Sequence, residues 1–501
     1  MSGKWKVNSC ILAVHCLCLG MPGQIQAAGF PDMWDDPLNA RPPVLDNAQA
    51  LPGDSLAGSC PPAVDLSQPL SLGDAIDLAL CNNPQIKSAW ASIKVQSAAL
   101  GEARAAYLPT LNSTLSRLNT ATHYPEFSSA DTNNWGNTAY AGLNWRLFDF
   151  GGRESNKKAA NALLAAAMAQ HDATLQKTLT TVVGAYFDAL SAQAAFNARS
   201  QAATLAEQTG LATQRREARG TAARNDTLQA QTALAKSQLA AQRAQGDHRK
   251  TLSILAYALG VAQQPRLVLP EQSSMPAVQA IEDLSAWLES TQQQHPAIIA
   301  ARAQWQAAQA KITSARSEGL PTLDFVSNFY QNGYPNQGLQ LTRTDTTTYG
   351  VTLTIPIFEG FARTYKIRGA QAQAEQSEAQ LQDVEHQILG EVVKAHADAQ
   401  SSLANLASSE NLLSSAQEAL ISSQNRYERG ASDILELLSV QSALADAQQE
   451  RIRCLSEWQS ARLRLWAAAG LMGRNKIAGS EEARLPQASA PIVPADGNEL
   501  R

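Results

Sequence analysis

The sequence has no long hydrophobic run. No segment comes near the roughly 18 consecutive apolar residues that a membrane-spanning helix requires. It also has no excess of positive charge, since 40 Lys and Arg stand against 45 Asp and Glu, for a net charge of -5. We therefore expect no transmembrane helix, and charge gives no reason to expect nucleic acid as a partner.

Motifs of catalysis and cofactor binding are absent as well. The sequence contains no P-loop, no dinucleotide-binding fingerprint, no His-Glu-x-x-His motif and no Cys-x-x-Cys pair. The 7 histidines are scattered, and His386 and His396 are too far apart on a predicted helix to share a metal ion. These absences predict a protein that is not an enzyme and that holds no cofactor and no metal.

Cysteine is scarce, with 6 residues in the chain. Residues 1–28 have the basic start, the short apolar core and the small-residue end of a secretory signal peptide. Its removal would leave Cys60, Cys81 and Cys454. An oxidising compartment permits a Cys60–Cys81 disulfide that ties residues 29–70, an extended N-terminal arm, to the first helix. Three unpaired structural cysteines are the alternative.

The sequence does contain an internal repeat. Its two halves match at an offset of 212 residues early and 210 afterwards, so one small length difference accounts for every match. The matched pairs include Leu108-Pro109-Thr110-Leu111 with Leu320-Pro321-Thr322-Leu323, Phe148 with Phe358, Arg153 with Arg363, and Arg216, Arg219 and Gly220 with Arg426, Arg429 and Gly430. Such a duplication predicts one architecture built from two similar halves.

The predicted organisation follows from this repeat. We expect a first repeat over 71–262, a linker over 263–282, a second repeat over 283–473 and a disordered tail over 474–501. Each repeat should contain one long helix, two shorter helices and a strand pair. The expected long helices are 152–219 and 361–428, the shorter helices are 84–107, 222–260, 296–320 and 432–470, and the strand pairs are 110–123 with 137–148 and 322–333 with 346–358.

The lengths of these helices indicate how they pack. The two shorter helices of the first repeat together span about 95 Å, close to the roughly 100 Å of its long helix. The second repeat has the same proportions. We therefore expect two short helices stacked end to end beside one long helix, twice, and a first helix that begins at Ser71 with Asp74 in its first turn.

The strand segments alternate between apolar and polar residues, as half-buried strands do. Four strands cannot close a barrel, but three chains would supply twelve strands, and strands of this length suit an outer-membrane barrel. Trp145 and Tyr349 could then lie at a membrane interface. The alternative is a soluble β-layer packed on helices.

In this order and spacing, the motifs resemble those of the TolC family of outer-membrane channel-tunnels. The resemblance covers about residues 71–473 and rests on Leu78-Ala79-Leu80-Cys81-Asn82-Asn83-Pro84, the repeated Leu-Pro-Thr-Leu, Leu147-Phe148-Asp149-Phe150-Gly151-Gly152-Arg153 and Tyr427-Glu428-Arg429-Gly430. The arm and the cysteine element look most like members that serve type I secretion of large toxins, such as the adenylate cyclase–haemolysin exporter.

The resemblance implies a mixed α/β membrane protein. Its fold would be an internally duplicated α-helical barrel with four β-strands per chain, and a homotrimer would close a twelve-stranded β-barrel in outer-membrane lipid. Its implied partners are a periplasmic adaptor protein and an inner-membrane ABC exporter or RND pump, with no nucleic acid. The pump would supply the energy.

The family pattern also suggests a site. Gly220 and Gly430 would form the turns at the periplasmic tip, and an acid follows six residues after each turn: Asp226 and Glu436. These acids would line the closed end as a cation-attracting ring. The alternative is a pair of solvated acids favoured by the helix dipole.

The pattern is not fully matched at this tip. Ser432 and Ser439 stand where the family carries an arginine and a second acid, and Asp433 lies beside the first. Tyr427 matches a gate tyrosine of the family. We expect a different ion-pair network, in which the arginines of the two turns, Arg216, Arg219, Arg426 and Arg429, supply the pairs or are simply solvated.

Function is then a choice among several classes. We expect an export duct that serves type I protein secretion, with small-molecule efflux as the alternative. A periplasmic adaptor is more remote, because the sequence shows neither a lipoyl-like module nor an inner-membrane anchor. A coiled-coil scaffold is also more remote, because it does not explain the strand pairs that recur between the long helices.

Overall fold

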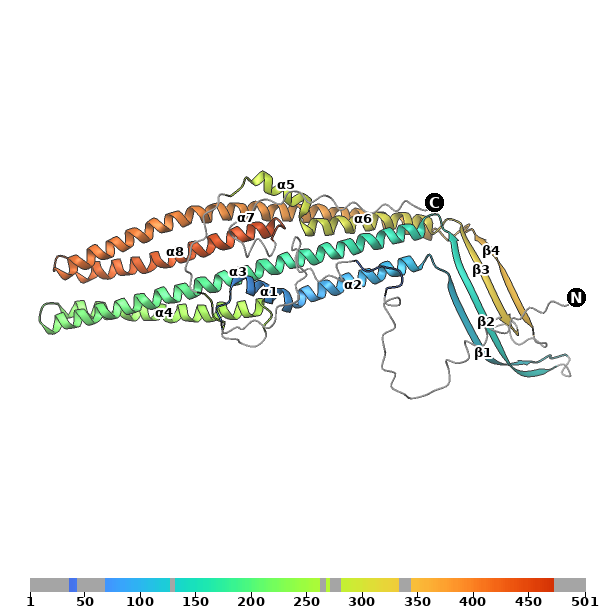
Figure 1. Cartoon of the computed structure of the whole chain (residues 1–501), viewed down its shortest axis with the longest axis horizontal. Coiled ribbons are helices and arrows are strands. Elements are labelled where there is room, and N and C mark those ends of the chain that lie inside the picture. Colours follow the sequence, from blue (N-terminus) through green and yellow to red (C-terminus); the bar gives the residue numbers. More distant parts are fainter. Residues whose placement is uncertain are drawn as a thin grey trace.

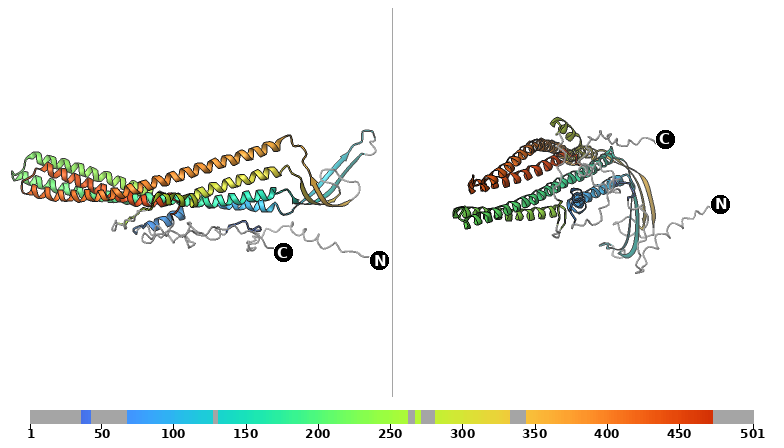
Figure 2. Two further views of the ribbon diagram at one scale, coloured as in Figure 1. Left: turned by 90° about the horizontal axis from the view of Figure 1, so that it is seen from above. Right: turned by 60° about the vertical axis from the view of Figure 1, so that its left-hand side comes forward.

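The computed structural model describes residues 36–42, 68–126, 131–261, 267–270, 281–332 and 344–472. The predicted signal peptide (1–28) and tail (474–501) lie outside the described residues, as do most of the arm and most of the linker. The described chain forms a long helical rod with a small sheet at one end (Figure 1). The sheet leaves the rod at an angle (Figure 2).

The elements follow the same order twice: two helices, two strands, one long helix and one shorter helix. The first set is α1 (Leu72–Asn82), α2 (Pro84–Ala105), β1 (Thr110–Thr122), β2 (Thr132–Phe148), α3 (Gly152–Ala218) and α4 (Arg224–Ala258). The second set is α5 (Leu284–Gln294), α6 (Pro296–Ser317), β3 (Thr322–Gln331), β4 (Asp345–Thr354), α7 (Ala362–Glu428) and α8 (Ile434–Ala468). The duplicated fold predicted from the sequence is confirmed, and α3 and α7 have the same length of 67 residues.

Several boundaries differ from those expected. Strand β2 begins at Thr132 rather than at 137, because its first residues still pair with β1 beyond the point where β3 ends. Strand β4 ends at Thr354 rather than at 358, and Pro356, which has no N–H to donate, follows closely. Helix α5 was not assigned from the sequence, whereas Ser71 caps α1 as predicted by accepting a hydrogen bond from the N–H of Asp74 at 3.1 Å.

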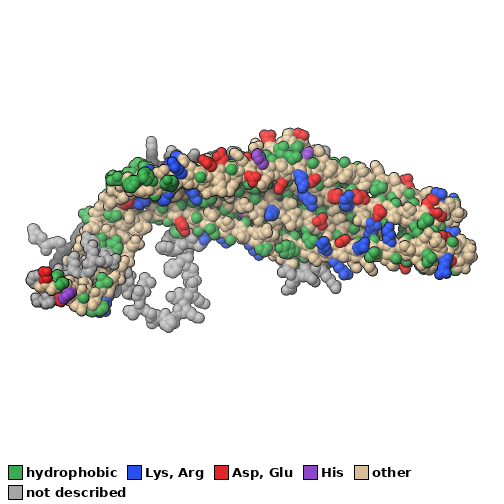
Figure 3. All heavy atoms as spheres, turned by 180° about the vertical axis from the view of Figure 1, so that it is seen from behind, with side chains coloured by type: hydrophobic (Ala, Val, Ile, Leu, Met, Phe, Trp, Pro, Cys, Tyr) green, Lys and Arg blue, Asp and Glu red, His purple; other side chains and the backbone are tan. Residues whose placement is uncertain are grey.

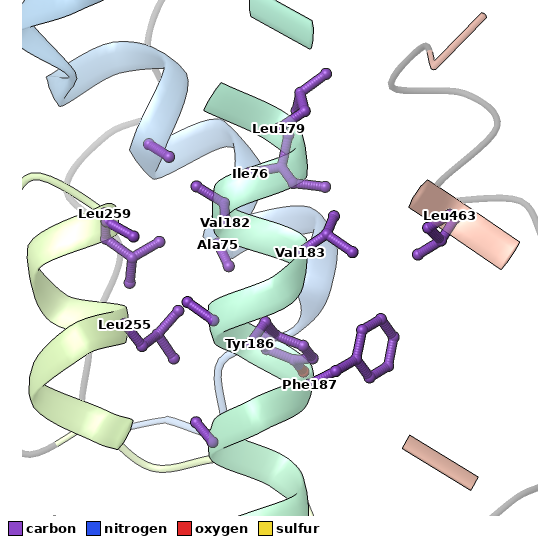
Figure 4. Packing of buried hydrophobic residues seen from close by; sticks show 14 of the residues in the cluster. Ala75, Ile76, Leu179, Val182, Val183, Tyr186, Phe187, Leu255, Leu259 and Leu463 are labelled. Carbon is purple, nitrogen blue, oxygen red and sulfur yellow. The ribbon is translucent and has the colours of Figure 1, made fainter. Parts of the chain in front are cut away.

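The helices stack in the predicted way. Helices α2 and α4 lie along opposite halves of α3, with α1 between them, and α6 and α8 lie in the same way along α7 (Figure 1). Helix α3 also packs on α6 and α8, which joins the two repeats. The largest apolar cluster lies where α1, α3 and α4 meet (Figure 4). It contains the fully buried Ile76, Leu179, Val182 and Leu255.

Polar contacts join distant segments at this cluster. The Tyr186 hydroxyl, buried in the cluster, donates to the carbonyl oxygen of Leu70 at 3.0 Å, and burial raises the pKa of Tyr186 to about 12. The N–H of Leu70 in turn donates to the carbonyl oxygen of Val268 at 2.8 Å. Gln176 on α3 donates to the carbonyl oxygen of Met472 at 2.9 Å, which fastens the end of the second repeat to the first.

The sheet is an antiparallel meander in the order β1-β2-β3-β4, so β1 and β4 are its two edges. Its register gives it two unlike sides, because directly paired residues point to the same side. The apolar side carries Leu111, Leu115, Ala139, Ala141, Leu143, Trp145, Leu323, Phe325, Phe329, Tyr349, Val351 and Leu353. The polar side carries Asn112, Thr114, Ser116, Tyr140, Asn144, Arg146, Asp324, Asn328, Thr348 and Thr352.

The apolar side is exposed to an unusual degree. Leu115 and Tyr349 are each 80% exposed, and Val351 and Leu353 are more than half exposed. A large exposed apolar patch of this kind usually marks a surface that contacts a membrane or another protein. None of the described helices combines the length and the hydropathy that crossing a bilayer requires.

Two matched arginines fix the turns between the sheet and the long helices. Arg153 donates to the carbonyl oxygens of Arg146 at 2.7 Å and Leu147 at 3.2 Å. Arg363 donates to those of Gly319 at 2.7 Å and Arg316 at 3.1 Å. Both arginines stand just inside the start of a long helix, but Arg153 bonds the end of β2, whereas Arg363 bonds the end of α6 and the turn that follows it.

The cysteine predictions are only partly within the described residues. Cys454 is free and buried, and Cys81 is disulfide-bonded. Cys60, the predicted partner of Cys81, lies outside the described residues. The Cys60–Cys81 pairing therefore stays a prediction.

The two repeats cap one helix differently, and this generates a prediction on pH. Asn83 caps α2 by accepting from the N–H of Gln85 at 2.8 Å, whereas His295 caps α6 by accepting from the N–H of Ala297 at 3.2 Å. His295 is 6% exposed, and burial lowers its pKa to about 4. The folded state therefore favours the neutral form of His295, and protonation of this side chain destabilises the folded state.

The free energy of unfolding should therefore fall as pH drops from about 6.5 towards 4, with His295 contributing about 3 kcal/mol of the loss. His295→Asn keeps a cap of the kind used in the first repeat but cannot titrate. Urea unfolding across this pH range should show a shallower loss in the variant than in the wild type. An equal dependence of the free energy of unfolding on pH in the two proteins would contradict the claim that His295 titrates on unfolding.

Candidate functional site

The turn between α3 and α4 and the turn between α7 and α8 lie together at the end of the rod opposite the sheet (Figure 1). Lys, Arg, Asp and Glu side chains gather on this tip (Figure 3). Every residue predicted for the tip is found at or next to one of the two turns. The residues predicted for the tip therefore lie at one end of the molecule.

Gly220 and Gly430 form the two turns. Their φ angles are 72° and 73°, in the left-handed region that side chains disfavour. In each turn the glycine N–H and the next N–H donate back to the last carbonyl groups of the long helix, at 2.8–3.0 Å. This is the Schellman arrangement, so both long helices end in the same way.

The acid of the second turn, Glu436, is held by several groups. Its carboxylate pairs with the Arg426 guanidinium at 2.8 Å and accepts from the Ser432 hydroxyl at 2.6 Å. Asp433 caps α8 by accepting from the N–H of Glu436 at 2.8 Å. The negative charge of Glu436 is thereby balanced within its own turn, and Ser432 has a part in this that the sequence did not predict.

The acid of the first turn, Asp226, has a different environment. Its carboxylate accepts from the N–H of Ala223 at 3.3 Å. Ala223 occupies the position that Asp433 holds in the second turn, so α4 has no side-chain cap there. Within the described chain, Asp226 forms no ion pair. The two predicted acids are therefore chemically unequal, because the described residues give Glu436 an ion pair and Asp226 only a backbone donor.

The four arginines also differ from one another. Arg426 makes the ion pair described above, whereas Arg216 bridges the two repeats: its guanidinium donates to the carbonyl oxygen of Tyr427 at 3.3 Å and lies 4.7 Å from the centroid of the Tyr427 ring. Arg219 and Arg429 are exposed, and among the described residues neither side chain has a hydrogen-bonded or ionic partner. Of the two expected alternatives, Arg426 thus follows the ion pair and Arg219 and Arg429 follow solvation, whereas Arg216 makes a cation–π contact instead.

A second polar region lies on the sheet. Arg146 and Asp324 face each other on its polar side and form an ion pair at 2.9 Å. Tyr140 donates to the Asn328 side chain at 3.1 Å and packs against Tyr330, with ring centroids 5.2 Å apart. These groups satisfy one another across β2 and β3, so this side of the sheet suits contact with water.

Midway along the rod, the helices border a hollow of about 970 Å³. Lys177, Lys394 and Arg464 line it together with Glu391 and Asp398, from α3, α7 and α8. Charges of both signs and many amide and hydroxyl groups make this a hydrated wall rather than a pocket for one apolar ligand. No motif in the sequence marks this hollow, because its lining residues are brought together only by the packing of the helices.

Comparison with known proteins points in one direction. The model of the family described as "Outer membrane efflux protein" matches residues 75–261 and 287–471, once in each repeat. The chain is 35% identical over 442 residues to Protein CyaE of Bordetella pertussis, covering 88% of this chain and 92% of that protein.

The chain is also similar to the alkaline protease secretion protein AprF of Pseudomonas aeruginosa. The identity is 26% over 447 residues, which covers 85% of this chain and 91% of AprF. Among solved structures, the outer membrane protein VceC from Vibrio cholerae matches with a TM-score of 0.68 at 22% identity, covering 80% of this chain and 96% of VceC. At that identity the likeness shows a shared fold.

The contact between Arg216 and Tyr427 generates a prediction for the tip. Arg216→Ala removes the cation–π contact and the hydrogen bond that join the two turns, together worth about 1 kcal/mol at an exposed site. Amide hydrogens of the two turns should then exchange about fivefold faster. Arg219→Ala, at the same tip, is the matched control and should leave exchange unchanged. Equal exchange in both variants would show that the contact does not hold the turns together.

Proposed function

The chain belongs to the outer membrane efflux protein family, and from this membership we propose that three copies form an export duct with a periplasmic adaptor and an inner-membrane pump. The resemblance predicted from the sequence is confirmed at the family level. The protein is an outer-membrane protein whose helices extend into the periplasm. Its role is transport rather than catalysis.

One observation carries the proposal: a two-sided sheet that ends in two unpaired edges. In hydrocarbon, backbone groups of an open edge cannot be satisfied by water, so only closed sheets span membranes. One chain offers β1 at one edge and β4 at the other. Three chains joined edge to edge would give twelve strands, with the apolar side towards lipid and the polar side around a channel.

The polar side supports a hydrated passage. Its ion pair and tyrosine contacts are internally satisfied, so they would line an aqueous lumen without binding cargo tightly. The rod continues this passage for the length of α3, roughly 100 Å. A duct of that length reaches from the outer membrane far into the periplasm, where an adaptor and a pump can engage the tip.

We favour protein secretion of the type I kind as the use of this duct. The relative AprF is named for the secretion of an alkaline protease, and the match to it covers most of both chains. Small-molecule efflux is the second candidate, because the family itself is described by efflux. The pump would select the cargo, so the two uses need no difference in the duct.

The test is the protein profile of the culture medium from a strain that lacks this gene, compared with the same strain after complementation. Type I secretion predicts the loss of one large polypeptide and its return on complementation. A profile that stays unchanged while drug tolerance falls would contradict protein secretion and favour efflux.

The inequality of the two tip acids generates a second prediction. Asp226→Ala removes a negative charge that has no ion pair among the described residues, so it should weaken the cation preference and the block by multivalent cations. The double variant Arg426→Ala/Glu436→Ala removes a pair that is already neutral, so it should keep both properties. Reversal potentials across a planar bilayer under a salt gradient measure the difference. An unaltered reversal potential in Asp226→Ala would exclude Asp226 from the channel lining.

A further inference from the structure

The described strands carry only two cationic side chains, and they lie on opposite sides of the sheet. Arg146 is on the polar side, where Asp324 neutralises it at 2.9 Å. Arg117 pairs in register with Asn137 on the apolar side, in line with Leu111 and Leu115. A cation on the side of a sheet that faces lipid needs a separate explanation.

The surroundings of Arg117 contain no charge that balances it. Its guanidinium lies 5.8 Å from the centroid of the Trp135 ring, and Trp135 is 68% exposed. Among the described residues, no carboxylate forms an ion pair with Arg117. The pair thus presents a positive charge beside a broad apolar ring, both open to whatever surrounds the sheet.

The height of the pair in the membrane follows from the strands. Over residues 132–138, which precede Ala139, strand β2 pairs only with β1. The β1–β2 hairpin therefore extends past the ends of β3 and β4, away from the helices (Figure 1). Because the helices extend into the periplasm, this hairpin end is the outer-surface end. An Arg facing lipid costs about 2–4 kcal/mol at the midplane but about 0–1 near the interface. Trp also prefers the interface, so both residues fit the level of the outer-leaflet head groups.

We propose that Arg117 and Trp135 form a binding site for the phosphate group of an anionic lipid in the outer leaflet. A guanidinium binds a phosphate through two parallel hydrogen bonds, a geometry that lysine cannot reproduce. The Trp135 ring packs beside the head group and keeps the guanidinium directed towards it. This site concerns how the duct is held in its membrane, and it does not depend on the nature of the cargo.

One other group could neutralise Arg117. Asp345 is the only carboxylate on the apolar side of the described strands, and it begins β4, the opposite edge strand. In a closed barrel, β4 of a second copy would lie beside β1 and could bring Asp345 towards Arg117. The experiment must therefore separate a lipid phosphate from the Asp345 of another chain.

Lipid A with two phosphates is the probe, added to the purified full-length protein in detergent and counted by native mass spectrometry. Lipid A without phosphates and inorganic phosphate are the controls. The wild type should bind the phosphorylated lipid more tightly than the dephosphorylated one. Arg117→Gln should weaken binding of the phosphorylated lipid about tenfold. Arg117→Lys should weaken it less, and Asp345→Asn should bind like the wild type.

Three results would overturn the proposal. Equal lipid binding by Arg117→Gln and the wild type would show that the guanidinium takes no part. Tighter lipid binding by Asp345→Asn than by the wild type would show that Asp345 of a second chain neutralises Arg117. Full displacement of the lipid by millimolar inorganic phosphate would identify a site for free phosphate instead of a head group.

Discussion

The unpaired backbone groups along β1 and β4 are the constraint on which the rest of this structure depends. The sheet is antiparallel and fully paired inside the chain, but its two edges expose rows of N–H and C=O groups. Each such group costs several kcal/mol when it is buried in hydrocarbon without a partner. The apolar side of the sheet favours contact with lipid, whereas the unpaired edges make insertion of a single chain into lipid unfavourable. The proposed assembly of several copies would resolve the conflict, and the polar side would then enclose an aqueous passage.

The internal repeat supplies the scaffold, and local differences between its halves supply the chemistry. Both long helices have an arginine near their start that bonds the adjoining segments, and both end at a glycine with a left-handed φ angle. The residues after each glycine have diverged. One turn pairs Glu436 with Arg426 and Ser432, whereas the other leaves Asp226 with a single backbone donor. Duplication thus gives the tip two similar turns in which the two matched acids, Asp226 and Glu436, have different partners.

Much of the fold could be predicted because it rests on local signals. The long helical segments predicted α3 and α7 closely, and the alternation of apolar and polar residues in the segments of β2 and β4 predicted two unlike sides. The glycines after the long helices marked their ends. What could not be predicted depends on contacts between distant residues. The Arg216–Tyr427 contact joins the two repeats, and the extra length of β2 depends on its pairing with β1 beyond β3. Neither leaves a periodic pattern in the sequence.

The number of chains in the complex tests the central claim most directly. The complex should be extracted from the outer membrane in mild detergent, and its mass should be measured without heating. Closure of the sheet edge to edge by the family architecture predicts three chains in each complex. A folded single chain embedded in the membrane, or a complex of any other number, would contradict the account that the edges of β1 and β4 are satisfied by their counterparts in a trimer.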